Sequence, residues 1–419
     1  MRLRSSILAF LVFTLGLLML GSGGLEKTES AEYRLIVASD LHYLAPDLTD
    51  HGASFRQLMA NSDGKMTEYC VEITDAFLAE VLEQQPEALI LTGDLSFNGA
   101  RQSHLSLAEK LRAVEAGGVP VFVIPGNHDL YRGSSAAYFG DGYEKVPSVS
   151  GEEFRQIYAD FGFDEALSAD EDSLSYAVSI NERTWLFMLD ANTPHDYCSL
   201  SSETLTWLEL QLQAAREQGI HCLAACHQNL YQHSMFQGGY QLSCSKKLHE
   251  LLERYGVPLI LSGHMHIQHI KTEGNVTEIA SSALTMGACQ YGLLSFENNK
   301  HSYEARSVDV SSWAKKQDTR DKKLLCFSEY AEKTFCDRTE AQARAMLRDL
   351  SCTDEEREAL ISYACQLNLA YFNGDLTGID ALDPDGLLQQ RWEESGLFFG
   401  SYLASIRPEF GSDHRHWSD

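Results

Sequence analysis

Residues 119–129, VPVFVIPGNHD, combine a short apolar run with an abrupt polar ending. The run Val119–Ile124 is short and rich in Val, which is typical of a strand buried on both faces in a parallel sheet. Gly126, Asn127, His128 and Asp129 follow at its carboxyl end. Because ligands and catalytic groups in open α/β sheets collect just beyond the carboxyl ends of strands, this stretch predicts an α/β fold with a functional site at one sheet edge.

Four other apolar runs end in the same way, each in a polar cluster. These runs lie at 35–38, 88–92, 220–225 and 257–261, and they lead into Asp40-Leu41-His42, Gly93-Asp94, Cys226-His227 and Gly263-His264-Met265-His266. Between the runs, apolar residues recur at helical spacing in 66–85, 101–116, 201–218 and 243–255. Ser150 and Glu153 form a capping-box pattern that predicts a helix near 151–161. Strands are expected at 267–270, 276–280, 292–296 and 302–306, so residues 33–308 are predicted to form one α/β domain that ends in β structure.

The character of the sequence changes beyond residue 310. Residues 324–335, 340–350 and 354–371 have helical spacing, many charges and almost no strand signal. We expect residues 310–405 to form a smaller, all-helical C-terminal domain. We expect residues 406–419, which include His414 and His416, to form a tail.

Residues 1–24 have the pattern of an export signal. Arg2 and Arg4 precede an uncharged apolar stretch at 7–20, and small residues follow at 21–24. The apolar stretch is shorter than the roughly 20 residues of a membrane span, which favours a cleaved signal peptide over a retained N-terminal anchor. We therefore expect an extracytoplasmic protein, secreted or anchored to the outer face of the cell membrane, that contacts the membrane only through this segment if it is uncleaved.

The net charge of −27 at pH 7 excludes one class of partner. A nucleic-acid polymer would be repelled, because its binding depends on basic residues that neutralise the phosphate backbone. A small phosphate compound is still a possible ligand if metal ions supply the positive charge. The ten cysteines can pair in an exported protein, although Cys222 and Cys226 would lie about 13 Å apart along one strand, too far for a disulfide.

The polar clusters together supply the donors of a two-metal site. Their candidate ligands are Asp40, His42, Asp94, Asn127, His227, His264 and His266, with His128 left over. Oxygen and imidazole donors without thiolate favour Mn, Fe or Zn, as two divalent or trivalent ions. Asp94 is the natural bridge, since one carboxylate can give an oxygen to each metal. Glycine before Asp94, Asn127 and His264 is expected to let the backbone turn sharply.

The ordered series D-x-H, G-D, G-N-H-D, H and G-H-x-H, from Asp40 to His266, resembles the calcineurin-like metallophosphoesterase superfamily. Its opening is more similar to class III cyclic nucleotide phosphodiesterases than to plant-type purple acid phosphatases. The whole chain is similar to exported Gram-positive phosphodiesterases of this kind. The resemblance implies a β-sandwich flanked by helices, an αββα fold. It also implies two ligand sets, with His128 as the catalytic histidine: Asp40, His42, Asp94 and His266 for the first metal, and Asp94, Asn127, His227 and His264 for the second.

The expected activity is hydrolysis of a small phosphodiester, a cyclic nucleotide above all, by attack of a metal-bridging hydroxide. Two alternatives stay open: a phosphomonoesterase or 5′-nucleotidase on the same site, and a surface binding protein whose site is vestigial. Asp129 is a second catalytic candidate, expected to hold His128 in position, with the capping of a turn as the alternative. Asn98 and Tyr131 are candidates for lining the substrate pocket, and His195, Tyr197 and His233 lie in segments that could overhang it. The sequence leaves the oligomeric state open.

Overall fold

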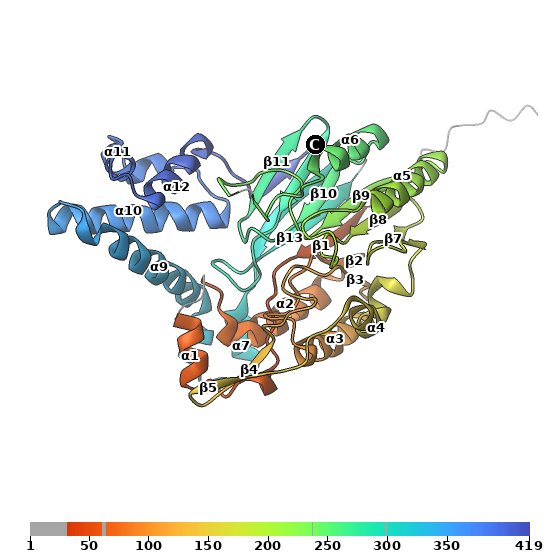
Figure 1. Ribbon diagram of the computed structural model, residues 1–419, viewed down its shortest axis with the longest axis horizontal. Coiled ribbons are helices and arrows are strands. Elements are labelled where there is room, and N and C mark those ends of the chain that lie inside the picture. Colours follow the sequence, from red (N-terminus) through yellow and green to blue (C-terminus); the bar gives the residue numbers. More distant parts are fainter. Residues whose placement is uncertain (1–31, 61–63, 237, 298–299) are drawn as a thin grey trace, which may run out of the picture.

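The computed structural model describes residues 32–60, 64–236, 238–297 and 300–419 (Figure 1). The expected signal peptide or anchor at 1–24 lies outside the described residues. Within these ranges no helix combines the length and the apolar character that a membrane crossing requires.

Two large β-sheets form the centre of the molecule. One has the strand order β15 (His416–Ser418), β14 (Lys300–Ser307), β13 (Gln290–Glu297), β1 (Tyr33–Ala38), β2 (Ala88–Leu91) and β3 (Val121–Val123). The other has the order β11 (His269–Glu273), β12 (Val276–Ala280), β10 (Leu259–Ser262), β9 (His221–Cys226), β8 (Thr184–Leu189), β7 (Tyr176–Asn181) and β6 (Ser168–Ala169). Leu35 and Leu89 of the first sheet share one buried apolar cluster with Leu223 and Leu261 of the second, so the sheets pack face to face.

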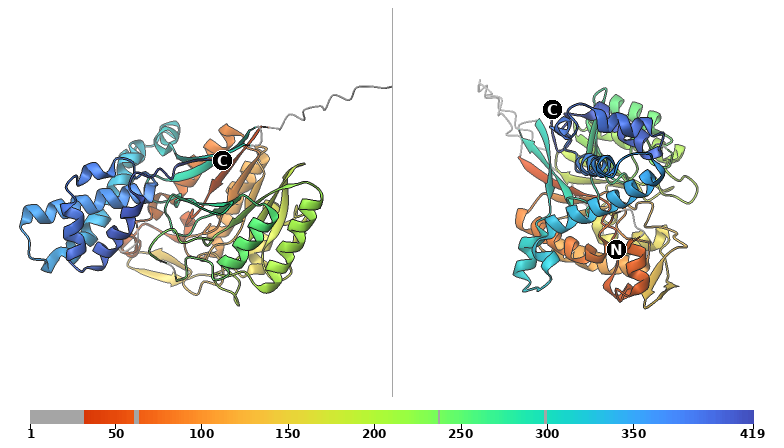
Figure 2. Two further views of the ribbon diagram at one scale, coloured as in Figure 1. Left: turned by 90° about the horizontal axis from the view of Figure 1, so that it is seen from above. Right: turned by 90° about the vertical axis from the view of Figure 1, so that its left-hand side faces the viewer.

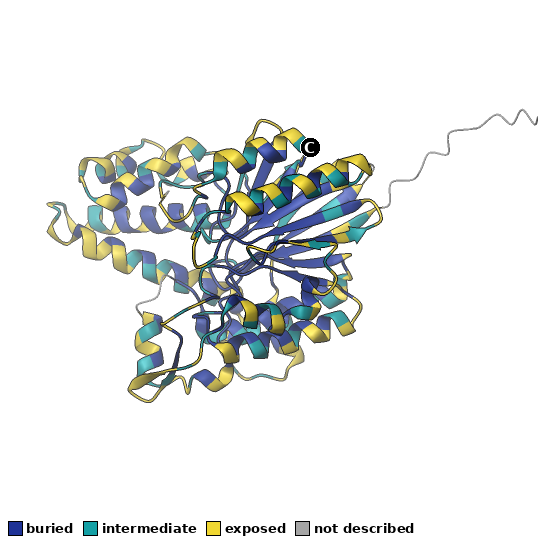
Figure 3. Ribbon diagram, turned by 45° about the vertical axis from the view of Figure 1, so that its right-hand side comes forward, coloured by how far each residue is buried: buried dark blue, intermediate teal, exposed yellow. Residues whose placement is uncertain are grey.

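Both sheets combine parallel and antiparallel strands: in the first the parallel strands β1, β2 and β3 lie at one edge, and in the second they form the centre. Strand β2 pairs in parallel with β1 and β3, and β9 pairs in parallel with β8 and β10. The sequence of β2, ALIL, is apolar throughout and all four residues are buried, as expected for a strand covered on both faces (Figure 3). Because parallel strands end at the same edge, the polar residues that follow them are carried to one side of the sandwich.

Helices cover the outer face of each sheet. Helices α2 (Cys70–Gln84) and α3 (Arg101–Ala116) pack on the first sheet through residues such as Phe77 and Leu111. Helices α5 (Ser202–Glu217) and α6 (Ser245–Tyr255) pack on the second through Leu212 and Leu252. The expected β-sandwich flanked by helices is confirmed.

Smaller elements complete the part of the chain before residue 310. Helix α1 (Ala53–Ala60) lies near a hairpin of β4 (Ala136–Phe139) and β5 (Gly142–Lys145) (Figure 1). Helix α4 (Gly151–Ile157) begins at the expected capping box, in which Ser150 Oγ accepts from the Glu153 amide and Glu153 Oε2 accepts from the Ser150 amide. It ends earlier than expected, because Tyr158 already leaves helical geometry, with φ −104° and ψ 21°.

The region beyond residue 310 is helical and extends to one side of the sandwich (Figure 2). Its helices are α7 (Val310–Lys316), α8 (Lys322–Leu325), α9 (Phe327–Met346), α10 (Asp354–Asn373), α11 (Leu387–Glu394) and α12 (Phe398–Ile406). Helices α9 to α12 enclose an apolar core around the fully buried Trp392, whereas Val310 of α7 and Leu324 of α8 belong to the core of the sandwich. Ile267 of the sandwich belongs to the core around Trp392, so the two regions are packed together.

The residues expected to form a tail are instead part of the fold. Strand β15 pairs antiparallel with β14, and Trp417 lies opposite Tyr303 in that pairing. His414 is 8% exposed, and its ring stacks on His269 with 3.9 Å between ring centroids. Cross-strand aromatic pairs and ring stacking fix this segment, which explains why the expectation of a tail is wrong.

Glu409, His269 and His414 form a partly buried polar cluster between the helical region and β11. Glu409 Oε2 lies 3.4 Å from His414 Nε2 and 3.8 Å from His269 Nε2. The Ile270 amide donates to His414 Nδ1 at 3.3 Å, so in the neutral ring the proton sits on Nε2, which faces the Glu409 carboxylate. Contacts to both imidazoles hold the pKa of Glu409 below its usual range. The cluster therefore joins the two regions through contacts of one carboxylate with two imidazole rings.

Candidate metal centre

Every metal ligand expected from the sequence lies at one edge of the sandwich, beyond the carboxyl ends of β1, β2, β3, β9 and β10. Backbone hydrogen bonds align the loops that carry them. The Asp40 amide donates to the Gly93 carbonyl at 3.0 Å, and the His42 amide donates to the Asp94 carbonyl at 2.9 Å. The loops after β1 and β2 therefore run side by side.

Asp40, His42, Asp94 and His266 form the first donor group, whose ligand atoms all lie within 4.8 Å of one another. His266 Nε2 is 3.1 Å from His42 Nε2 and 3.2 Å from Asp40 Oδ1. Asp40 Oδ1 is buried and has no hydrogen-bond partner among the described residues. Asp40 Oδ2 accepts a hydrogen bond from the His264 amide at 2.9 Å. A buried carboxylate oxygen aimed at two imidazole nitrogens fits a metal ion.

Asp94, His227 and His264 form the second donor group, again with ligand atoms within 4.8 Å of one another. His227 Nδ1 donates to the Thr92 carbonyl at 2.9 Å, which leaves Nε2 as the ligand atom. Asn127 Oδ1 lies 3.0 Å from that Nε2, so the amide joins the same group. These are the residues that the sequence resemblance assigned to the second metal.

The Asp94 carboxylate has one oxygen in each group. Its Oδ2 lies 3.8 Å from His42 Nε2, and its Oδ1 lies 3.4 Å from His227 Nε2. Oδ1 also accepts from the His128 amide at 2.7 Å, which fixes the plane of the carboxylate. This orientation is the one required of a ligand shared by two ions.

The protonation states of the site suit cation binding. Burial raises the pKa of Asp94, but His227 and His128 lower it more, so the carboxyl pKa lies well below its usual range. Burial lowers the pKa of His42 well below 6.5 and that of His264 to about 4, so both rings are neutral at pH 7. Burial also opposes charge on His227, yet Asp94 raises the pKa of His227 to about 9. A cation bound beside Asp94 would replace the proton on that ring.

The backbone at five of the seven ligands is in the left-handed region. The φ values are 54° at Asp40, 44° at His42, 48° at Asp94, 70° at His264 and 59° at His266. Such conformations cost about 1–3 kcal/mol each in non-glycine residues and persist where the surrounding structure enforces them. Their concentration at the strand ends indicates that the fold maintains this arrangement for function.

The glycines beside the ligands act in two different ways. Gly93 has a φ of 100°, so it provides the sharp turn expected from the sequence. Gly126 and Gly263 have no positive φ, yet a turn begins at each, since the Asp129 amide donates to the Gly126 carbonyl at 3.2 Å and the Met265 amide donates to the Gly263 carbonyl at 2.7 Å. They are needed for close approach, because a Cβ at Gly126 would overlap the backbone nitrogen and Oδ1 of Asp94, and a Cβ at Gly263 would overlap Ser39 Oγ.

Gly126→Ala is expected to weaken metal binding about 10- to 100-fold, the range found when groups that orient metal ligands are altered. The added methyl group displaces Asp94, which belongs to both donor groups. Competition titration against a metal indicator measures the affinity. Gly142→Ala is the matched control, since a Cβ there meets no atom within 4 Å. Equal affinities in the two variants would contradict the packing argument.

His128 lies beside both donor groups without belonging to either. Its Nε2 is 4.0 Å from Asp94 Oδ2, and its side chain is 31% exposed. Nδ1 donates to the Phe97 carbonyl at 3.0 Å, which fixes the ring and the tautomer. Sequence reasoning missed Phe97, because a backbone carbonyl leaves no residue-type signal.

Asp129 does not contact the His128 ring in the way expected of a catalytic partner. Its two oxygens accept hydrogen bonds from the amides of Leu95, Ser96 and Gly126 and from Ser96 Oγ. The buried carboxylate therefore ties the loop after β2 to the loop after β3. Asp129 therefore positions the loops, which agrees with the turn-capping alternative, since its Oδ2 accepts from the Gly126 amide. A catalytic role for Asp129 stays a prediction.

The two residues expected to contact substrate lie in different settings. Asn98 is 6% exposed and its amide nitrogen donates to the Ala136 carbonyl at 3.0 Å, so this group serves the fold. Tyr131 is 50% exposed, and its hydroxyl accepts from the Gly151 amide at 3.0 Å. Substrate contact by either residue stays a prediction.

The three residues expected to overhang the substrate pocket also lie in different settings. His195 is exposed, and Tyr197 is 58% exposed. Burial and then Cys198 raise the pKa of Tyr197, and the charge of Asp94 adds to the rise. His233 is 5% exposed, and its Nε2 lies 2.8 Å from the buried Glu278, so it supports the loop after β9.

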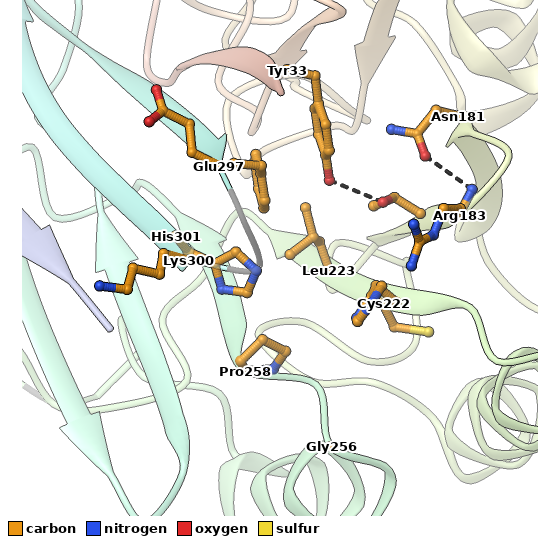
Figure 4. Close-up of a pocket in the computed structure, with 13 residues that line it drawn as sticks. Tyr33, Asn181, Arg183, Cys222, Leu223, Gly256, Pro258, Glu297, Lys300 and His301 are labelled. Carbon is orange, nitrogen blue, oxygen red and sulfur yellow. Dashed lines mark hydrogen bonds between the residues drawn. The ribbon is translucent and has the colours of Figure 1, made fainter. Parts of the chain in front are cut away.

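A separate cavity lies at the opposite end of the sandwich (Figure 4). Tyr33, Thr184 and His221 line it, and these residues begin β1, β8 and β9. Its volume is about 150 Å³, and its lining includes none of the metal-centre residues. This cavity is therefore separate from the candidate metal centre, which lies at the other edge of the sandwich.

Comparisons with known proteins assign the two regions of the chain separately. Residues 33–268 match the family described as calcineurin-like phosphoesterase. Residues 309–409 match the C-terminal domain of cyclic nucleotide phosphodiesterase. A 3′,5′-cyclic-nucleotide phosphodiesterase of Nostoc sp. is 25% identical over 219 residues, which cover 50% of this chain and 69% of the relative.

Two solved structures are similar at low identity. A dimetal phosphatase from Danio rerio has a TM-score of 0.49 at 12% identity, over 66% of this chain and 96% of that one. A putative 5′-nucleotidase from Staphylococcus aureus has a TM-score of 0.40 at 14% identity, over 72% of this chain and 58% of that one. The family match covers more than half of the chain and includes every residue of both donor groups. The chain belongs to the calcineurin-like phosphoesterase family.

Proposed function

We propose that this protein is a phosphodiesterase that uses two metal ions to hydrolyse small phosphodiesters, with cyclic nucleotides as the natural class. The observation that carries the proposal is the position of Asp94, which gives one oxygen to each of two donor groups. The name of the Nostoc relative and the match of residues 309–409 support the choice of cyclic nucleotides.

The donor residues of the site have separate roles in metal binding. Asp40, His42 and His266 would hold one ion, Asn127, His227 and His264 would hold the other, and Asp94 would hold both. When bound, such ions neutralise phosphoryl oxygens and lower the pKa of bound water. In a chain with a net charge of −27, this local positive charge makes binding of an anionic diester favourable.

His128 is placed to act on the substrate itself. With Nδ1 held by the Phe97 carbonyl, its Nε2 faces the edge of the metal centre. A protonated ring in this position donates a hydrogen bond to a phosphoryl oxygen, or a proton to the departing oxygen. The ring is partly exposed, so it can meet a substrate that arrives from solvent.

The test is hydrolysis of bis-p-nitrophenyl phosphate and p-nitrophenyl phosphate by metal-stripped protein that is then reloaded with manganese. We expect manganese-dependent release from the diester, little release from the monoester, and turnover of 3′,5′- or 2′,3′-cyclic nucleotides in a following panel. Preference for the monoester would replace the proposal with a phosphatase or nucleotidase. Inactivity on both esters with metal bound would favour a binding protein.

We also propose that the protein acts outside the cytoplasm, on the strength of the pattern at 1–24. The measurement is the mass and N-terminal sequence of the product of the full-length gene. Recovery of the intact chain in the cytoplasm would refute export.

A further inference from the structure

A cavity of about 200 Å³ opens directly beside the metal centre. His264 and His266 form its inner wall. The loop after β9 contributes Phe236 and Tyr240, and the helical region contributes Phe372 and Tyr402. One wall of the cavity therefore comes from each of the two regions of the chain.

Two of the aromatic side chains that line this cavity are partly exposed. Tyr240 is 38% exposed and Phe236 is 36% exposed. The ring of Tyr240 lies 5.1 Å from that of metal-centre His264, and the ring of Phe236 lies 6.0 Å from that of Tyr402. Exposed aromatic surface that is continuous with a polar centre is typical of a ligand site.

The wall formed by the helical region is held in place by hydrogen bonds. Tyr402 is 7% exposed, and its hydroxyl donates to Asn368 Oδ1 at 2.7 Å. Tyr371, which also lines the cavity, donates from its hydroxyl to the His233 carbonyl at 2.7 Å. The rings are therefore oriented before any ligand arrives, which reduces the entropy lost on binding.

We infer that this aromatic cavity, lined by Phe236, Tyr240, Phe372 and Tyr402, binds the base of a nucleotide whose phosphate lies at the metal centre. The inference rests on the proposed function. It gives the helical region a direct part in substrate binding, because Phe372 and Tyr402 belong to α10 and α12. Because stacking is available to every base, the cavity favours nucleotides over small alkyl diesters without strong selection among bases.

The test uses inhibition of bis-p-nitrophenyl phosphate hydrolysis, which does not require a cyclic nucleotide as substrate. Stacking of one base is worth roughly 1–3 kcal/mol, so adenosine monophosphate should inhibit about 5- to 150-fold more tightly than inorganic phosphate. Tyr240→Ala, which removes the exposed ring beside His264, should abolish most of this difference and leave inhibition by phosphate unchanged. Tyr240→Phe should retain the difference, because the ring remains.

The matched control is Tyr143→Ala, which removes a ring that is 69% exposed on β5 and outside the cavity. Equal inhibition by adenosine monophosphate and phosphate in the parent protein would overturn the inference, whichever diester is hydrolysed. An unchanged difference in Tyr240→Ala would also overturn it. If the monophosphate binds as expected but no cyclic nucleotide is turned over, the base subsite stands and the proposed substrate class fails.

Discussion

Asp94→Asn is expected to lower diester hydrolysis at least about 10³-fold, because two ions supply several kcal/mol of transition-state stabilisation and each 1.36 kcal/mol is tenfold in rate. The two carboxylate oxygens lie toward different donor groups, at 3.8 Å from His42 and 3.4 Å from His227. An amide retains one acceptor oxygen and replaces the other with a donor. The variant should therefore bind fewer than two ions per chain, as measured by elemental analysis.

The matched control for this prediction is Asp141→Asn, which removes the same charge from an exposed turn between β4 and β5. It should retain two ions and parental activity. Two ions and parental activity in Asp94→Asn itself would show that the carboxylate does not bridge metals.

His128→Ala is expected to lower kcat about 10²- to 10⁴-fold while both metals stay bound, the range typical of a positioned general acid. The ring belongs to neither donor group, and the amide that orients Asp94 is a backbone group that alanine retains. Parallel measurements of kcat and metal content separate chemistry from metal binding.

Two outcomes would contradict this role of His128. Loss of metal in this variant would make His128 a ligand, and an unchanged kcat would remove it from the catalytic machinery.

The sequence predicted the strands of an α/β fold and the donor groups because their signals are local, whereas the sandwich arrangement was implied by the family resemblance. Each buried strand is a short apolar run, and each candidate ligand follows such a run within a few residues. The capping box at Ser150 is local in the same sense, and its helix begins where expected. Parallel pairing places the carboxyl ends of these strands at one edge of the sheet, so ligands that are distant in the sequence come together there.

The roles of Asp129, Phe97 and Glu278 were beyond sequence reasoning, because their partners lie far along the chain. Asp129 bonds the amides of Leu95 and Ser96, and Phe97 acts through its carbonyl. Glu278 accepts from the amides of Leu230 and Tyr231. A residue type alone does not reveal which backbone groups a fold will place beside it.

Strand β15 returns the chain to the sheet of the catalytic sandwich after the helical region has been completed. In the order of the chain, the helical region is therefore inserted between β14 and β15, which are neighbouring strands of one sheet. Separation of the two regions would first require the β14 and β15 ladder to open, and with it the cluster of Glu409, His269 and His414. The two regions are therefore expected to melt in one cooperative transition, with the wall of the aromatic cavity preserved until the sandwich itself unfolds.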